Sequence, residues 1–439
     1  MKRLILLLII AIMTAGLAPA AHAGAAEDFE DAYELRLAAA ACLAAYSDRM
    51  GLLARDYLRQ DGWEIIPFRK SAEEADARFL LARNLTQTGR SRYVLAVVGT
   101  ETFKDFKVDL RTEKVYFAGR TPDEFAESAK IQGVEDTEPK VHRGFHEYVQ
   151  VALTARTAGE GQANDRLVRE LLTDPAGEML IVGHSLGGAA ATIAGARLLS
   201  MGVRPEQIGV ITFGAPAVGN EAFSRQFAPR LDLTRVVIAG DPVTGILQKM
   251  VGGYRQFGRE LVWQRSALFE KGPHAMAEYL DLAVKNYYDR RSAAVKAGFH
   301  TLPQAGPSAA GLRIYVAPPH EYLPDGLKVE YRYMEQALVD QYRRLLPGYV
   351  LGEAGVDPAK GATAAGARYY VVAEISGLKM KNEHNQYFVT LQHTVYDAAG
   401  KVVYINSYAS VTANMTPLEA LAHDSAGAVA DLAGWLAAR

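Results

Sequence analysis

The chain has 439 residues, 49% of them hydrophobic and 22% charged, which is enough material for two soluble domains with their own cores. Its 48 Lys and Arg residues nearly balance its 50 Asp and Glu residues, so the formal net charge is −2. This balance, with no basic stripe of interleaved aromatic residues, argues against a nucleic-acid-binding protein. The single cysteine, Cys42, excludes an intrachain disulfide and is expected to be a small buried hydrophobe.

The first 23 residues have the pattern of a secretion signal. A basic pair precedes the apolar run 4–13, and residues 21–23 (AHA) have the small-x-small form of a signal-peptidase site. We therefore expect a signal peptide over residues 1–23 and an exported protein, periplasmic or secreted. An uncleaved membrane anchor is the alternative, because residues 4–21 are nearly long enough to span a bilayer.

Residues 24–300 show predicted strands alternating with predicted helices. Apolar residues recur at helical spacing over 28–60. Further strands are expected at 93–99, 179–182, 207–213 and 234–239, and further helices at 144–152, 164–173, from 186 and at 275–288. This alternation predicts an α/β domain whose mainly parallel sheet carries helices on both faces.

The composition changes after about residue 300. Residues 301–311 have two prolines, two glycines and no charge, which is typical of a linker. Beyond it we expect strands at 312–317, 368–376, 387–396 and 401–411, helices at 330–346 and from 417, and a Gly- and Ala-rich loop at 352–366. Residues 312–439 are therefore predicted to form a smaller α+β accessory domain with a half-exposed antiparallel sheet.

A reactive serine is indicated by the stretch Gly183-His-Ser-Leu-Gly187, which joins an apolar run to a helix rich in small residues. Gly183 and Gly187 flank Ser185 because a sharp strand-to-helix turn leaves little room for side chains. Such a turn places the serine at a helix N-terminus, where free N–H groups favour a developing anion. A Gly-rich helix start with a capping serine is the alternative, and His184 is expected to pack rather than titrate.

A serine nucleophile needs a general base, and the base needs an orienting carboxylate. On this type of sheet the order along the chain is serine, acid and histidine. Asp241 follows a predicted strand at the carboxyl edge of the sheet, whereas the rival Asp232 precedes that strand. His274 starts a helix after a loop that can reach this edge, while His300 borders the linker. We therefore predict Ser185, Asp241 and His274 as the catalytic residues.

The tetrahedral intermediate of ester cleavage carries a negative oxygen, and each preorganised donor to it is worth about 3 to 4 kcal/mol of barrier. The backbone N–H of Leu186 is expected to be one donor, and Thr100, just past a predicted strand, is placed to supply another. Phe103 and Phe106 follow within a short amphipathic segment. Two interpretations of that segment stay open, a lid that a lipid surface draws away and a surface helix that packs two phenylalanines.

Seven stretches in this order resemble the class 3 lipase family, the fungal-lipase-like and plant-phospholipase-like branch of the α/β hydrolases. They are AAYSD at Ala44, VVGTETFKDFKVDL at Val97, VHRGFHEYV at Val141, GHSLGGAAA at Gly183, ITFGAPAVGN at Ile211, RVVIAGDPV at Arg235 and HAMAEYL at His274. The resemblance spans about residues 30–290. It implies an α/β-hydrolase fold, the triad of Ser185, Asp241 and His274, and oxyanion positions at Thr100 and Leu186.

The same resemblance implies a lid over residues 103–109 and a supporting role for Asp109 behind the oxyanion loop. Val98 and Ala217 stand where the family usually has arginine, and neither replacement touches the triad. The C-terminal module weakly resembles small βαβββα domains of Gram-negative envelope proteins, and no function is inferred from that likeness.

The sequence therefore predicts an exported serine ester hydrolase that cleaves acyl esters of lipids, either a triacylglycerol lipase or a phospholipase, at a membrane or lipid surface. No metal or cofactor is expected, because the sequence has no clustered ligand set. The alternative is a catalytically silent lipid-binding or envelope-assembly protein whose C-terminal domain is the working part. Acyl transfer to an alcohol other than water would use the same triad.

Overall fold

The computed structural model describes residues 24–46, 49–66, 68–69, 79–85, 91–97, 113–154, 156–157, 174, 176–250, 252–265, 272–303, 306, 313–381, 386–412 and 415–439. The expected signal peptide, the helix at 164–173 and most of the expected linker lie outside these residues. Within them, no helix combines the length and the apolar character needed to cross a membrane.

The described residues divide into two compact units. The first unit comprises residues 34–265 and 272–282, and the second comprises residues 24–33 and 283–439. The predicted boundary near residue 300 stays a prediction, but residues 283–300 are grouped with the C-terminal part of the chain. Two ion pairs connect residues 283–300 to the rest of the second unit: Lys285 pairs with Glu330 at 2.7 Å, and Arg291 pairs with Asp340 at 2.6 Å.

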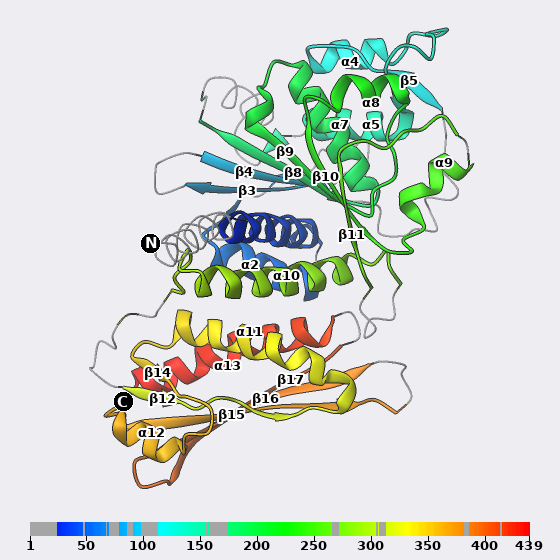
Figure 1. Ribbon diagram of the computed structural model, residues 1–439. Coiled ribbons are helices and arrows are strands. Elements are labelled where there is room, and N and C mark those ends of the chain that lie inside the picture. The colour runs from blue at the N-terminus through cyan, green and yellow to red at the C-terminus, as the bar shows by residue number, and fades with distance from the viewer. Residues whose placement is uncertain are drawn as a thin grey trace, which may run out of the picture. The chain divides into compact units, whose positions relative to one another are not determined.

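A seven-stranded sheet forms the centre of the first unit (Figure 1), in the order β1-β3-β4-β8-β9-β10-β11. The strands are β1 (Glu64–Ile66), β3 (Phe79–Leu85), β4 (Ser91–Val97), β8 (Glu178–His184), β9 (Ile208–Phe213), β10 (Asp232–Ile238) and β11 (Arg259–Trp263). From β4 to β11 every neighbouring pair is parallel, while β1, β3 and β4 pair antiparallel. The prediction of a mainly parallel sheet is confirmed.

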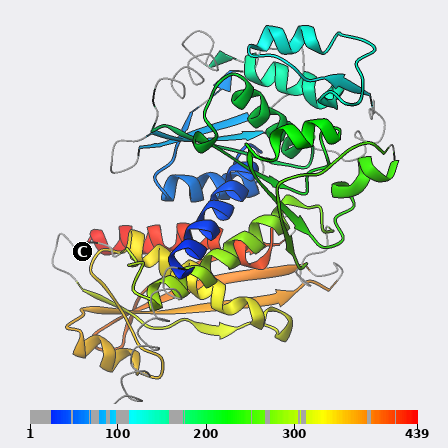
Figure 2. The same cartoon turned by 45° about the horizontal axis from the view of Figure 1, so that its top comes forward.

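Helices cover both faces of this sheet, as Figures 1 and 2 show. On one face lie α5 (Arg143–Thr154) and α7 (Leu186–Ser200), and on the other lie α2 (Arg49–Gln60) and the helix that includes residues 34–44. Residues 187–199 of α7 are all buried, and the glycines and alanines among them let the helix pack closely on the strands. Strand β8 is buried from Met179 to Gly183, as expected for a central strand covered on both faces.

Shorter elements complete the first unit. They are β2 (Phe68–Arg69), β5 (Lys114–Tyr116), α4 (Pro122–Ser128), β6 (Lys140–His142), β7 (Arg156–Thr157), η1 (Pro205–Gln207), α8 (Glu221–Phe227), η2 (Val243–Gly245) and α9 (Ile246–Met250). Phe117, Phe125, Phe223 and Phe227 join several of these elements in one buried aromatic cluster.

The second unit contains a six-stranded sheet in the order β14-β12-β15-β16-β17, with β13 paired to β15. Its elements are β12 (Ile314–Val316), β13 (His320–Tyr322), η3 (Asp325–Glu330), α11 (Tyr331–Leu345), β14 (Tyr349–Leu351), α12 (Pro358–Ala364), β15 (Tyr369–Lys379), β16 (Tyr387–Asp397), β17 (Val402–Val411) and α13 (Pro417–Ala437). Helix α10 (Met276–Lys296) begins in the first unit and continues into the second.

The expected antiparallel pattern holds for only part of this second sheet. Strands β15, β16 and β17 are antiparallel, as predicted, and β15 and β16 alternate buried with more exposed residues. Strand β12, however, pairs parallel with both β14 and β15. The sheet is therefore mixed, because α11 lies between β12 and β14 in the chain and a helical crossover makes neighbouring strands parallel.

The expected loop at 352–366 is wrong in part, because α12 forms within it. Asp357 caps the helix by accepting the Lys360 N–H at 3.0 Å, and Pro358 occupies the first turn. Gly361 is required by packing, since a Cβ there would lie 2.3 Å from Tyr315 Cζ. The Gly and Ala residues that suggested a loop thus allow close contact between α12 and β12.

Candidate active site

Ser185 occupies a strained turn between β8 and α7. Its φ of 57° is the one positive value for a residue other than glycine in the part of the chain that the structure describes. A Cβ at Gly183 would lie 2.2 Å from the Gly187 carbonyl oxygen, and one at Gly188 would lie 2.7 Å from Ala215 Cβ. The glycines therefore permit the sharp turn that exposes the serine hydroxyl.

The three residues predicted as a triad come together at the carboxyl edge of the first sheet. His274 Nε2 lies 2.9 Å from Ser185 Oγ, and His274 Nδ1 lies 2.9 Å from Asp241 Oδ2. The carboxylate accepts the Nδ1–H, which leaves the Nε2 lone pair facing the serine hydroxyl. This arrangement can remove the serine proton and stabilise the imidazolium that results.

The side chain of Asp241 is fully buried and accepts hydrogen bonds from groups other than His274. Its Oδ1 accepts the Val243 N–H at 2.9 Å, and its Oδ2 accepts the Tyr279 hydroxyl at 2.8 Å. The Tyr279 oxygen in turn accepts the Ile238 N–H at 3.0 Å. Burial and the nearby Asp241 charge raise the pKa of Tyr279, so the tyrosine stays a neutral donor to the carboxylate.

Sequence reasoning did not single out Tyr279 or Gly214, although both lie inside the stretches that carry the family resemblance. Gly214 follows β9 with a φ of 57°. A Cβ at this position would lie 2.5 Å from Asp241 Oδ2 and 3.0 Å from the Tyr279 hydroxyl oxygen. The absence of a side chain at Gly214 therefore leaves room for the buried carboxylate and its partners.

The predicted oxyanion and lid residues have different outcomes. Leu186 is the first residue of α7, so its N–H belongs to the first helical turn, whose N–H groups have no acceptor within the helix. Thr100, Phe103, Phe106 and Asp109 all lie outside the described residues. Their roles stay predictions.

The rival residues lie elsewhere. Asp232 is the exposed first residue of β10, at the opposite end of that strand from Asp241. His300 belongs to the second unit, where its ring contacts Phe29 with centroids 4.6 Å apart. His142 and His146 are buried in the first unit, and burial lowers their pKa values to about 4 and about 3. These two histidines are therefore neutral at physiological pH.

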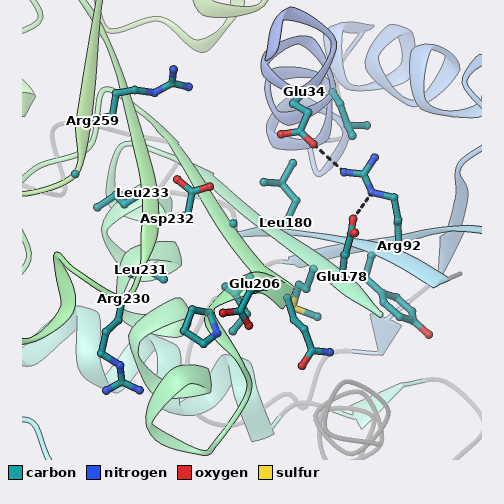
Figure 3. A pocket seen from close by; sticks show the side chains of 18 of the residues that line it. Glu34, Arg92, Glu178, Leu180, Glu206, Arg230, Leu231, Asp232, Leu233 and Arg259 are labelled. Atoms are coloured by element: carbon teal, nitrogen blue, oxygen red, sulfur yellow. Dashed lines mark hydrogen bonds and ion pairs between the residues drawn. The ribbon is translucent and has the colours of Figure 1, made fainter. Parts of the chain in front are cut away.

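A cavity of about 830 Å³ opens at the amino edge of the first sheet (Figure 3). Arg92 lines it and pairs with Glu34 at 2.8 Å and with Glu178 at 3.1 Å. Glu178 begins β8, and Ser185 follows the other end of that strand, roughly 20 Å away at the rise of an extended chain. This cavity is therefore separate from the three residues around Ser185.

Among the described residues, no group of three or more His, Cys, Asp or Glu side chains is arranged to hold a metal ion.

Residues 94–250 match the family model described as lipase (class 3). This segment is similar to class 3 lipases. The match confirms the family resemblance predicted from the sequence, and it includes Ser185 and Asp241.

Two curated proteins are similar to part of this chain. Secreted mono- and diacylglycerol lipase 1 of Fusarium solani is 31% identical over 121 residues, which are 27% of this chain and 33% of the relative. Phospholipase A(1) DAD1, chloroplastic, of Arabidopsis thaliana is 29% identical over 170 residues, 37% of this chain and 35% of the relative. The chain thus aligns with about a third of the length of each of these two relatives.

Solved structures of fungal lipases also resemble this chain. The lipase from Rhizopus microsporus var. chinensis has a TM-score of 0.39 and 21% identity, and the alignment covers 53% of this chain and 74% of that one. The family match ends at residue 250, so the C-terminal module stays unassigned.

Proposed function

We propose that the first unit is a serine ester hydrolase that cleaves acyl esters of lipids. The main support for the proposal is that the His274 imidazole is hydrogen-bonded on both sides. Its Nε2 lies 2.9 Å from Ser185 Oγ, and its Nδ1 lies 2.9 Å from Asp241 Oδ2. The match of residues 94–250 to class 3 lipases supports lipid esters as the substrates.

The proposed reaction has two stages. In the first, Ser185 Oγ attacks the acyl carbonyl carbon while His274 Nε2 takes the hydroxyl proton, and the negative oxygen faces the N–H of Leu186. His274 then gives that proton to the leaving alcohol as the carbonyl–oxygen ester bond breaks. In the second stage, water attacks the acyl-enzyme by the same route and releases the fatty acid.

The choice between glycerides and phospholipids stays open in this proposal. One aligned relative is named a mono- and diacylglycerol lipase and another a phospholipase A(1). Export is also a proposal, because it depends on the N-terminal pattern of residues 1–23 and the relatives carry both secreted and chloroplastic names.

Hydrolysis by the purified chain tests the proposal directly. We expect release of nitrophenol from short and long acyl nitrophenyl esters and release of fatty acid from vesicles that contain diacylglycerol or phosphatidylcholine. A fluorophosphonate should attach to Ser185, as mass spectrometry of peptides would show, and should stop the hydrolysis. Vesicle binding without hydrolysis of any ester would favour the silent lipid-binding alternative, and new esters formed from an added alcohol would show acyl transfer.

Replacing Gly214 by Ala is expected to lower the rate of ester hydrolysis by about 100-fold or more, since a displacement of about 1 Å in catalytic groups can cost that much. The new methyl group would meet Asp241 Oδ2 at 2.5 Å, and the φ of 57° adds strain. Gly209→Ala is the matched control within β9, because its Cβ would meet Leu180 at an ordinary 3.4 Å. Equal kcat values for the two variants would contradict the prediction that a methyl group at position 214 displaces the Asp241 carboxylate.

A further inference from the structure

His184, the residue before Ser185, contacts the backbone of the proposed base. Its Nε2 lies 2.8 Å from the carbonyl oxygen of His274. A carbonyl oxygen only accepts, so Nε2 of His184 must carry the proton of this hydrogen bond. Because Ser185 Oγ lies 2.9 Å from His274 Nε2, two consecutive residues of the turn hold one histidine, at its backbone and at its side chain.

The surroundings of His184 keep its imidazole neutral. Burial lowers the pKa of His184 to about 3, and the nearby His274 ring acts in the same direction. The hydrogen bond to the His274 carbonyl and the charge of Asp241 oppose this shift but are smaller. The two rings lie 4.7 Å apart at 34°, and the Tyr279 ring lies 6.0 Å from His184. A neutral ring here avoids repulsion with the imidazolium that His274 forms during the reaction.

The backbone of His274 lies outside the regular part of α10. It lies in the segment just before α10, where the turn closes with an Ala275 N–H to Gly272 carbonyl bond of 3.1 Å. Catalysis by proton transfer depends on a base held within hydrogen-bond reach of the nucleophile. The bond from His184 fixes the segment directly to the end of β8, the strand that presents Ser185.

We propose that His184 is a positioning residue, whose Nε2–H holds the His274 backbone so that the His274 imidazole stays between Ser185 and Asp241. This inference rests on the proposed function and adds a residue to it. In this proposal the second residue of Gly-His-Ser-Leu-Gly must be a hydrogen-bond donor. If it served packing alone, any ring of similar size would be sufficient.

Two substitutions separate the donor role from packing. His184→Phe keeps an aromatic ring and removes the donor, and we expect kcat to fall about 100-fold with little change in KM. His184→Gln retains an N–H that can reach the same carbonyl, and it should recover most of the lost kcat. His300→Phe serves as the control for loss of a histidine elsewhere and should keep wild-type kcat. Thermal unfolding of each variant shows whether it is folded.

The outcomes of this comparison are distinct. Wild-type kcat in the folded His184→Phe variant would overturn the proposal. An equal loss in His184→Phe and His184→Gln would also overturn it, because an N–H donor at this position would then have recovered none of the activity. A wild-type protein that hydrolyses no ester would instead overturn the proposed function.

Nuclear magnetic resonance of the full chain with ¹⁵N-labelled histidine tests the contact without using activity or a variant. We expect His184 to remain neutral, with its proton on Nε2, from pH 8 to pH 5. An Nδ1–H form, or titration near the ordinary histidine pKa of about 6.5, would overturn the proposal even in an active enzyme.

Discussion

Replacing Ser185 by Ala should lower kcat for ester hydrolysis by about 10⁶-fold, the scale of loss when a catalytic serine is removed. The hydroxyl that makes the nucleophile is lost, while the backbone bond from Ser185 N–H to the Phe213 carbonyl remains. The fold should be little affected, because the Ser185 side chain makes no capping bond to α7. The measurement is kcat on a nitrophenyl ester beside the thermal unfolding midpoint.

Ser200→Ala is the matched control for this variant. Ser200 ends the same helix, and its hydroxyl bonds the Ala196 carbonyl at 2.9 Å without contacting the triad. We expect wild-type kcat from it. A wild-type rate of hydrolysis by the Ser185→Ala variant would show that Ser185 is not the nucleophile.

Replacing Asp241 by Asn should lower kcat by about 10⁴-fold, as the loss of charge behind a catalytic histidine does in serine hydrolases. An amide nitrogen facing His274 Nδ1 would donate to it, and the imidazole proton would move to Nε2. His274 Nε2 lies 2.9 Å from Ser185 Oγ, and once it carries a proton it can no longer accept the proton of the serine hydroxyl. Binding of substrate should change little, so the effect should appear in kcat rather than in KM.

The control for this substitution is Asp232→Asn, at the exposed start of the same strand-and-loop segment. We expect it to retain wild-type kcat. Equal losses in the two variants, or an Asp241→Asn enzyme with wild-type kcat, would contradict the role given to Asp241. Thermal unfolding is needed alongside, since Asp241 also accepts hydrogen bonds from Val243 and Tyr279.

Local patterns in the chain predicted the central strands β4, β8, β9 and β10 of the first unit and the residues of the proposed triad, but not the outer strands β1, β3 and β11. The run of apolar residues before Gly183 predicted β8, because strands buried on both faces are continuously hydrophobic. The position of Asp241 after a strand, and of Asp232 before it, distinguished the two carboxylates. This works because all residues that follow parallel strands share one edge of the sheet.

The second unit shows where such patterns fail. The alternation in β16 predicted its buried face correctly, since successive side chains of a strand point to opposite sides. The pairing of β12 with β14 and β15 was not predicted, because the direction of a neighbouring strand depends on distant parts of the chain. Likewise, Gly361 suggests a loop until the nearby Tyr315 is known.

The amino-acid order alone was enough to predict the residues of the proposed triad and the central elements around them, because hydrophobic period and turn residues act over a few positions. Only the folded chain revealed the supports of the proposed site. Gly214, Tyr279 and His184 matter through what lies beside them, namely a carboxylate, a strand N–H and the carbonyl of a residue 90 positions away. Such contacts depend on tertiary packing, which brings distant segments together and leaves no periodic signal in the sequence.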